Sequence, residues 1–187
     1  TFDIIATIQI EDLDLFLSDP NYTSGFAGTV TAPELSPNAL VVTEGDFNLA
    51  VLDPDDPARV RRMKYRMLLT SEEGKKFFFD GFKIIRDDPG FDLWADTTTL
   101  YITVYEGESM EGPVVGKGIL HVALDDFQKQ ASTMKVLHAP NKREELKAMA
   151  RFGRYFSGTL FDIYAGIFAG GSLFDPDAPP RQKRPLR

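Results

Sequence analysis

Cysteine is absent from this chain, and histidine is limited to two residues, His121 and His138. Without cysteine the protein has no disulfide, no thiolate metal site and no cysteine nucleophile. Neither histidine stands at metal-ligand spacing from another ligand, so the pattern predicts no metal centre and no histidine-based triad. A nucleophile elbow and a dinucleotide fingerprint are also missing. We therefore expect a segment without catalytic residues, metal or cofactor of its own.

Positive charge and long apolar runs are also scarce. Lys and Arg number 21 against 28 Asp and Glu, which gives a net charge of −7. Nucleic-acid binding needs a basic face, so we expect no nucleic-acid partner. No apolar run reaches the roughly 18–20 residues that a transmembrane segment needs. No signal peptide is visible, and the lack of cysteine fits a reducing compartment, so the sequence predicts a cytoplasmic location. Because the chain opens on Thr1, we expect it to derive from something longer.

Aromatic residues are abundant, with 15 Phe and 6 Tyr. They lie in short segments where apolar and polar residues alternate, the pattern of half-buried strands. We predict about eight antiparallel strands, with Glu44-Gly45 as a hairpin turn and one helical turn over residues 11–17. The predicted strands cover residues 2–10, 26–32, 40–43, 47–52, 62–69, 75–86, 97–105 and 114–124.

Helices follow only after the strands, so the fold class is mostly β, or α+β. We favour an antiparallel, barrel-like meander with C-terminal helices at about 126–137 and 142–169. The alternative is a C2-like β-sandwich, because residues 98–124 are similar to the last strands of a C2 domain. We expect one domain over residues 1–171, followed by a Pro-rich, basic linker over residues 172–187.

Two acidic segments are candidates for calcium binding, because clustered carboxylates suit that ion. The full calcium-loop spacing is absent, and Asp-Pro and Asp-Asp are also common in turns, which is the interpretation that we favour. Calcium binding stays open. The acidic residues are Asp53, Asp55 and Asp56 in the first segment, and Asp87, Asp88, Asp92 and Asp96 in the second.

Several strand residues are candidates to line an apolar cavity, because each lies on a face that can point inward. They are Met63, Tyr65, Met67, Phe77, Phe79, Tyr101 and Tyr105. Asp96 near Tyr101 is the one combination that resembles a steroid-isomerase site, with an Asp base and a Tyr donor. Arg62, Lys64 and Arg66 share one strand face, which suits either solvent and edge protection or docking of an acidic neighbour.

Several motifs together resemble one family. They include EGDFNL (44–49), WADTTTLY (94–101), ARFGRYF (150–156) and GTLFD (158–162), with shorter matches at 29–32, 63–65, 81–83 and 87–89. The chain resembles the middle region of bacterial multidomain GMC-type oxidoreductases, known as cholesterol oxidases. The resemblance implies an FAD-dependent module before this segment and an α/β-hydrolase-like module after it, with residues 179–187 similar to the entry of the hydrolase. It carries over no catalytic residue.

Three functions follow as expectations. The first is a non-catalytic accessory module that binds or hands over a sterol or lipid-like ligand beside the oxidoreductase. The second is a structural module that orients the flanking modules or forms a homo-oligomer. The third is a small enzyme of the steroid-isomerase kind.

Overall fold

The structure is a computed structural model of the chain, and it describes residues 1–52, 61–85, 98–123, 126, 129 and 132–168. The chain divides into two compact units, Thr1–Ala123 and Leu124–Arg187. The sequence predicted one domain as far as residue 171, whereas the structure divides the chain earlier, after Ala123. The predicted linker over residues 172–187 lies outside the described residues.

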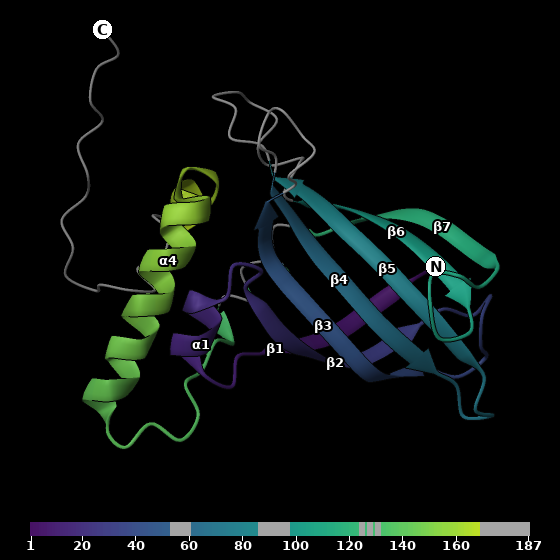
Figure 1. The fold of residues 1–187 in the computed structure, drawn as a ribbon, viewed down its shortest axis with the longest axis horizontal. Helices are drawn as coiled ribbons and strands as arrows, with labels where there is room; N and C mark the ends of the chain where they lie inside the picture. The colour runs from purple at the N-terminus through teal and green to yellow at the C-terminus, as the bar shows by residue number, and fades with distance from the viewer. Residues whose placement is uncertain (53–60, 86–97, 124–125, 127–128, 130–131, 169–187) are drawn as a thin grey trace, which may run out of the picture. The chain divides into compact units, whose positions relative to one another are not determined.

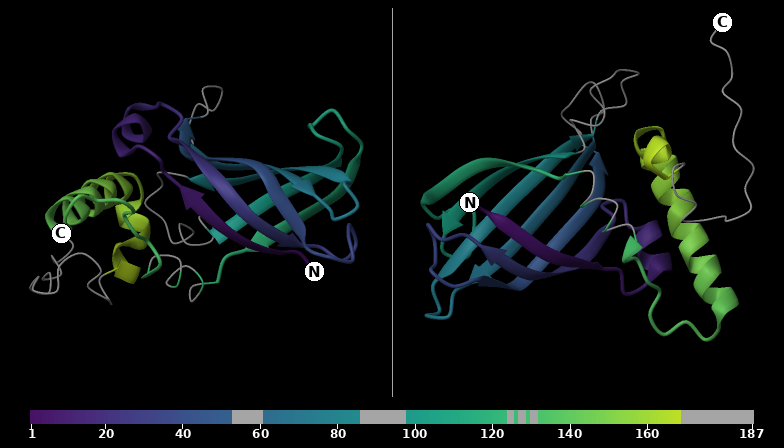
Figure 2. Two further views of the ribbon diagram at one scale, coloured as in Figure 1. Left: turned by 90° about the horizontal axis from the view of Figure 1, so that it is seen from below. Right: turned by 180° about the vertical axis from the view of Figure 1, so that it is seen from behind.

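Among the described residues, the first unit forms one antiparallel sheet of seven strands in the order β1-β2-β3-β4-β5-β6-β7 (Figure 1). The sheet curls into a half-barrel, as two further views show (Figure 2). The predicted barrel-like meander is confirmed, and the C2-like sandwich is not observed, because all seven strands belong to one sheet. The strands are β1 (Asp3–Gln9), β2 (Thr23–Thr31), β3 (Leu40–Leu52), β4 (Arg61–Thr70), β5 (Lys76–Ile85), β6 (Thr99–Glu106) and β7 (Val114–His121).

The predicted hairpin at Glu44-Gly45 is wrong, because β3 runs through it. Glu44 and Gly45 pair with Leu68 and Met67 of β4, just after a register shift that follows Val42. A Cβ atom on Gly45 would lie 2.4 Å from the carbonyl oxygen of Phe26. Gly45 therefore allows β2 to approach the bulged strand β3 closely, and it does not form a turn. Two predicted strands thus become one.

The core lies on the concave face of the half-barrel. Phe77, Phe79 and Ile85 alternate along β5 and are buried on this face. The ring of Phe2, which precedes β1, stacks on Phe79 with 5.7 Å between ring centroids. The start of the first strand therefore reaches the fifth strand across the concave face, and the aromatic residues that dominate the composition fill this space.

The convex face is organised in rows that run across the strands. The central row is polar, and in it Arg66 pairs with Asp80, with 3.1 Å between Nε and Oδ1. An aromatic and aliphatic row lies on each side, formed by Phe78, Tyr105 and Val114 and by Phe82, Tyr101 and Ile119.

The basic residues of β4 belong to this convex face. Arg62 lies 5.1 Å from the ring centroid of Phe82, and Arg66 pairs with Asp80. Because β4 lies between β3 and β5, the interpretation of this face as edge protection is wrong.

One short helix, α1 (Leu13–Ser18), connects β1 and β2. Asp12 caps it, since its Oδ1 accepts hydrogen bonds from the backbone N–H groups of Asp14 at 2.8 Å and Leu15 at 3.0 Å. The capped helix begins at Leu13, within the predicted helical turn over residues 11–17.

The second unit contains α4 (Lys142–Phe168), close to the predicted range of 142–169. Asn141 caps it, accepting a hydrogen bond from the N–H of Glu144 at 3.0 Å. In the predicted helix at 126–137, Asp126, Lys129 and Ser132 are helical and the other residues before 132 lie outside the described ones, but residues 133–137 are not helical, so the predicted end of this helix is wrong. None of the helices in the described ranges combines the length and apolar character that crossing a membrane requires.

Candidate ligand-binding site

Five of the seven predicted lining residues come together on the concave face. Met63, Tyr65 and Met67 alternate along β4, and Phe77 and Phe79 lie beside them on β5. Met67 is in register with Phe79, and both side chains are almost fully buried. They contribute to a packed aromatic and aliphatic layer.

Tyr65 is the centre of an aromatic cluster within this layer. Its ring centroid lies 4.9 Å from that of Phe47 and 6.1 Å from that of Phe26, and the second pair is edge-to-face. The Tyr65 hydroxyl donates a weak hydrogen bond to the Met63 sulfur at 3.8 Å. Burial raises the pKa of Tyr65, so the phenol stays protonated and can act only as a neutral hydrogen-bonding group near neutral pH.

Tyr101 and Tyr105 do not join the other five residues. Leu100, Ile102 and Val104 are the buried, inward residues of β6, so the alternating tyrosines lie on the convex face. Tyr101 stacks on Phe82 with 5.5 Å between centroids and is 39% exposed. The interpretation of these two tyrosines as cavity residues is therefore wrong.

Of the predicted isomerase pair, the structure describes only Tyr101. Asp96 lies outside the described residues, so its pairing with Tyr101 stays a prediction. The two acidic segments predicted as calcium candidates, at 53–56 and 87–96, lie there too. Within the described ranges, no group of three or more His, Cys, Asp or Glu side chains is arranged to hold a metal ion.

Lys83 is a polar group of the concave face that the sequence analysis missed. It follows Phe77, Phe79 and Gly81 in the inward alternation of β5, and its side chain is 8% exposed. Its ammonium lies 5.5 Å from the ring centroid of Tyr65, a cation–π distance. The alternation of β5 alone places Lys83 on the same face as Phe77 and Phe79, so its position was predictable from the sequence.

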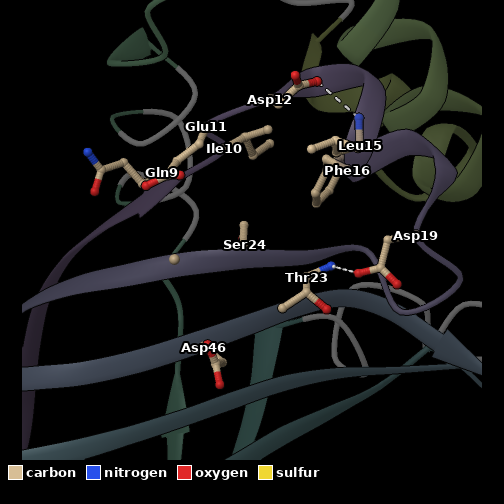
Figure 3. Close-up of a pocket in the computed structure, with 11 residues that line it drawn as sticks. Gln9, Ile10, Glu11, Asp12, Leu15, Phe16, Asp19, Thr23, Ser24 and Asp46 are labelled. Atoms are coloured by element: carbon tan, nitrogen blue, oxygen red, sulfur yellow. Dashed lines mark hydrogen bonds between the residues drawn. The ribbon is translucent and has the colours of Figure 1, made fainter.

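A pocket with a volume of about 330 Å³ lies beside α1 (Figure 3). Its apolar part is formed by Ile10, Leu15 and Phe16, and Ser24 points toward Phe16 from β2 (Figure 3). This volume is at the lower end of the range of about 300–1,000 Å³ that is typical of ligand pockets, and the pocket is an open depression and not an enclosed cavity. The remaining lining residues are Gln9, Glu11, Asp12, Asp19, Thr23, Gly25 and Asp46.

The carboxylates of this pocket are partly occupied by structural hydrogen bonds. Asp19 accepts from the backbone N–H groups of Asn21 at 2.9 Å and Thr23 at 2.8 Å. These hydrogen bonds hold the pKa of Asp19 below its usual value. Asp12 caps α1. Both carboxylates therefore shape the turn that holds α1 in place, and both keep the pocket negatively charged.

Ser24 connects the pocket with the concave aromatic cluster. Its hydroxyl donates a hydrogen bond to the carbonyl oxygen of Phe47 at 3.4 Å. Ser24 also lies on the same face of β2 as the buried Phe26, two residues further along the strand. Phe47 and Phe26 both contact Tyr65. The pocket thus lies at one end of the apolar concave face. Sequence alternation does not reveal it, because β1, α1, β2 and β3 form it together.

Comparisons of this chain with protein-family models, with curated proteins and with solved structures found no match.

Proposed function

We propose that this chain is a non-catalytic accessory module that binds a sterol or lipid-like ligand beside a GMC-type oxidoreductase module. The observation that carries the proposal is the pocket of about 330 Å³ beside α1, which adjoins the aromatic concave face. Apolar surface with a few polar groups is the usual composition of a small-molecule site. Here Ile10, Leu15 and Phe16 supply the apolar surface and Ser24 points toward Phe16 (Figure 3), while four of the eleven lining residues are acidic.

The position of the site follows from the packing. Phe79, Phe77 and Met67 already fill the middle of the concave face. A ligand there would have to displace buried rings, whereas the pocket beside α1 is open to it. The proposal therefore places the ligand at the α1 end of the half-barrel, with the ligand's apolar part against Phe16.

The charge of the pocket favours an uncharged ligand. Glu11, Asp12 and Asp19 line it, whereas Asp46 points away from Ser24 (Figure 3), and each of these three carboxylates would repel a ligand carboxylate by about 1 kcal/mol or less at a solvated position. A ligand hydroxyl group, in contrast, can donate a hydrogen bond to a carboxylate oxygen. We therefore expect a neutral alcohol such as a sterol to bind better than a fatty acid.

A fluorescent sterol titration tests this proposal. The chain is expected to bind the sterol saturably, and fluorescent fatty acids more weakly. Leu15→Glu is the informative variant, because Leu15 lines the pocket and is 70% exposed, so the substitution leaves the core intact. We expect an affinity loss of about tenfold, from lost apolar contact and an added charge.

Val41→Glu is the matched control, since Val41 is an exposed apolar residue of β3 that does not line the pocket. It should bind sterol like the unmodified chain. Absence of saturable sterol binding, or equal effects of the two variants, would refute the proposal.

A second candidate is a structural module that orients the neighbouring modules. It is favoured by the convex rows, where Tyr101, Val114 and Ile119 leave apolar surface exposed. Such surface is typical of interaction sites when it is contiguous. A calorimetric titration of the chain with a separately produced oxidoreductase module distinguishes this candidate, since it requires binding without any sterol.

A further inference from the structure

Within the described residues, the outer edge of β1 lacks three of the features that commonly protect an edge strand. In the parts of the chain that the structure describes, β1 pairs with β2 and with no other strand. Proteins commonly guard such an edge with Lys, Pro or a bulge. The β1 sequence, DIIATIQ, has neither residue, and its ladder with β2 runs without a register shift from Asp3 to Gln9. Ile5 on this strand is 77% exposed.

We propose that the edge of β1 pairs with β1 of a second copy of this chain, antiparallel, about a two-fold axis at Ala6. The backbone groups of successive residues in a strand point to opposite edges. A two-fold axis between identical antiparallel strands must therefore place one residue opposite its own copy. Only a centre at Ala6 pairs the whole strand, from Asp3 to Gln9.

This register is self-complementary in charge and shape. It places Ile4 opposite Ile8 on one face and Ile5 opposite Thr7 on the other. Asp3, the only charged residue of the strand, faces Gln9 and not another carboxylate. Pairs of β-branched residues stabilise antiparallel sheets, whereas like charges directly opposite each other destabilise them.

The other edge of the sheet is a poorer partner. β7 carries Lys117, Gly116 and Gly118, which weaken strand pairing. A contact of β1 with β7 of a second copy would also be head-to-tail, and such contacts form open chains unless a ring closes. The β1–β1 contact closes after two copies, so it predicts a discrete dimer.

Cysteine cross-linking tests the register, because the chain contains no cysteine of its own. Directly opposite Cβ atoms in an antiparallel pair lie about 4.5–5.5 Å apart, close to the distance that a disulfide bridges. Oxidation of the Ala6→Cys chain should give a disulfide-linked dimer on a non-reducing gel. Ile5→Cys and Thr7→Cys chains should link when mixed and much less when oxidised alone. Val41→Cys, exposed on β3, is the matched control and should stay monomeric.

Two outcomes overturn the proposal. One is cross-linking of the Ala6→Cys chain no faster than that of the Val41→Cys chain. The other is linking of the Ile5→Cys chain with itself as readily as with the Thr7→Cys chain.

Sedimentation of chains without cysteine gives an independent test. The unmodified chain should dimerise, and Ala6→Lys, which sets two ammonium groups opposite each other, should weaken the dimer about tenfold or more. Val41→Lys should leave dimerisation unchanged. A monomer at all concentrations, or a dimer that Ala6→Lys does not affect, contradicts pairing through β1.

Discussion

Replacing Phe79 by Ala tests whether the concave face is a packed core. The Phe79 side chain is fully buried, and Phe2 stacks on it at 5.7 Å. The ring also lies over Gly81, where an added Cβ atom would come within 2.7 Å of the Phe79 Cε1. Gly81 has no side chain, and Phe2 and Met67 are already packed against other parts of the core, so the space that Phe79 would leave is filled only in part. We therefore expect a loss of about 3–5 kcal/mol in the free energy of unfolding, from lost transfer energy and a residual cavity.

Urea denaturation followed by circular dichroism measures this loss. Phe82→Ala is the control, because Phe82 is half-buried on the convex face and stacks on Tyr101. It should cost only about 1 kcal/mol, the contribution of an aromatic pair with partial burial. If Phe79→Ala costs no more than Phe82→Ala, the concave face is not a packed core. A ligand could then also bind on the concave face, and not only beside α1.

Two further predictions concern a bulge and a turn. Gly45→Ala should destabilise the chain by about 1–3 kcal/mol in the same assay, since the new methyl group meets the Phe26 carbonyl at 2.4 Å; an unchanged midpoint would show that β2 and β3 can separate freely. Asp19→Asn should reduce stability at neutral pH and flatten its pH dependence. Because the folded pKa of Asp19 is lowered, its contribution is present above the unfolded value and is lost as pH falls through the folded one. The free energies of unfolding of the two chains should differ in their pH dependence between pH 2 and 6, that is over about the range where Asp titrates. If the two curves are parallel, Asp19 does not contribute to the pH dependence of stability.

The strands were predictable where alternation is clear. Phe77, Phe79 and Ile85 alternate with less buried residues along β5, and the structure buries them as the pattern requires. Alternation is a local property of the backbone, so it does not depend on the rest of the fold. The helical turn of α1 was predicted over residues 11–17, but its cap by Asp12 was not.

Prediction failed where one pattern has two physical causes. Glu44-Gly45 is typical of a turn, but in β3 the glycine serves close approach to Phe26. In β6 both faces carry apolar or aromatic residues, so alternation alone could not tell whether Tyr101 or Ile102 points inward. The burial of Ile102 decides it.

The pocket beside α1 was not predictable at all. Its walls come from the end of β1, from α1 and from β2 and β3. No single segment carries a motif for it, since only the curvature of the sheet and the capped helix bring these residues together. The class of ligand stays a prediction.

Titration of a fluorescent sterol into the unmodified chain and the Leu15→Glu chain tests the central claim most directly. The proposed site predicts saturable binding to the unmodified chain, with affinity reduced about tenfold by Leu15→Glu and unchanged by Val41→Glu. Binding that is absent, or that Leu15→Glu leaves unchanged, would contradict a sterol site beside α1.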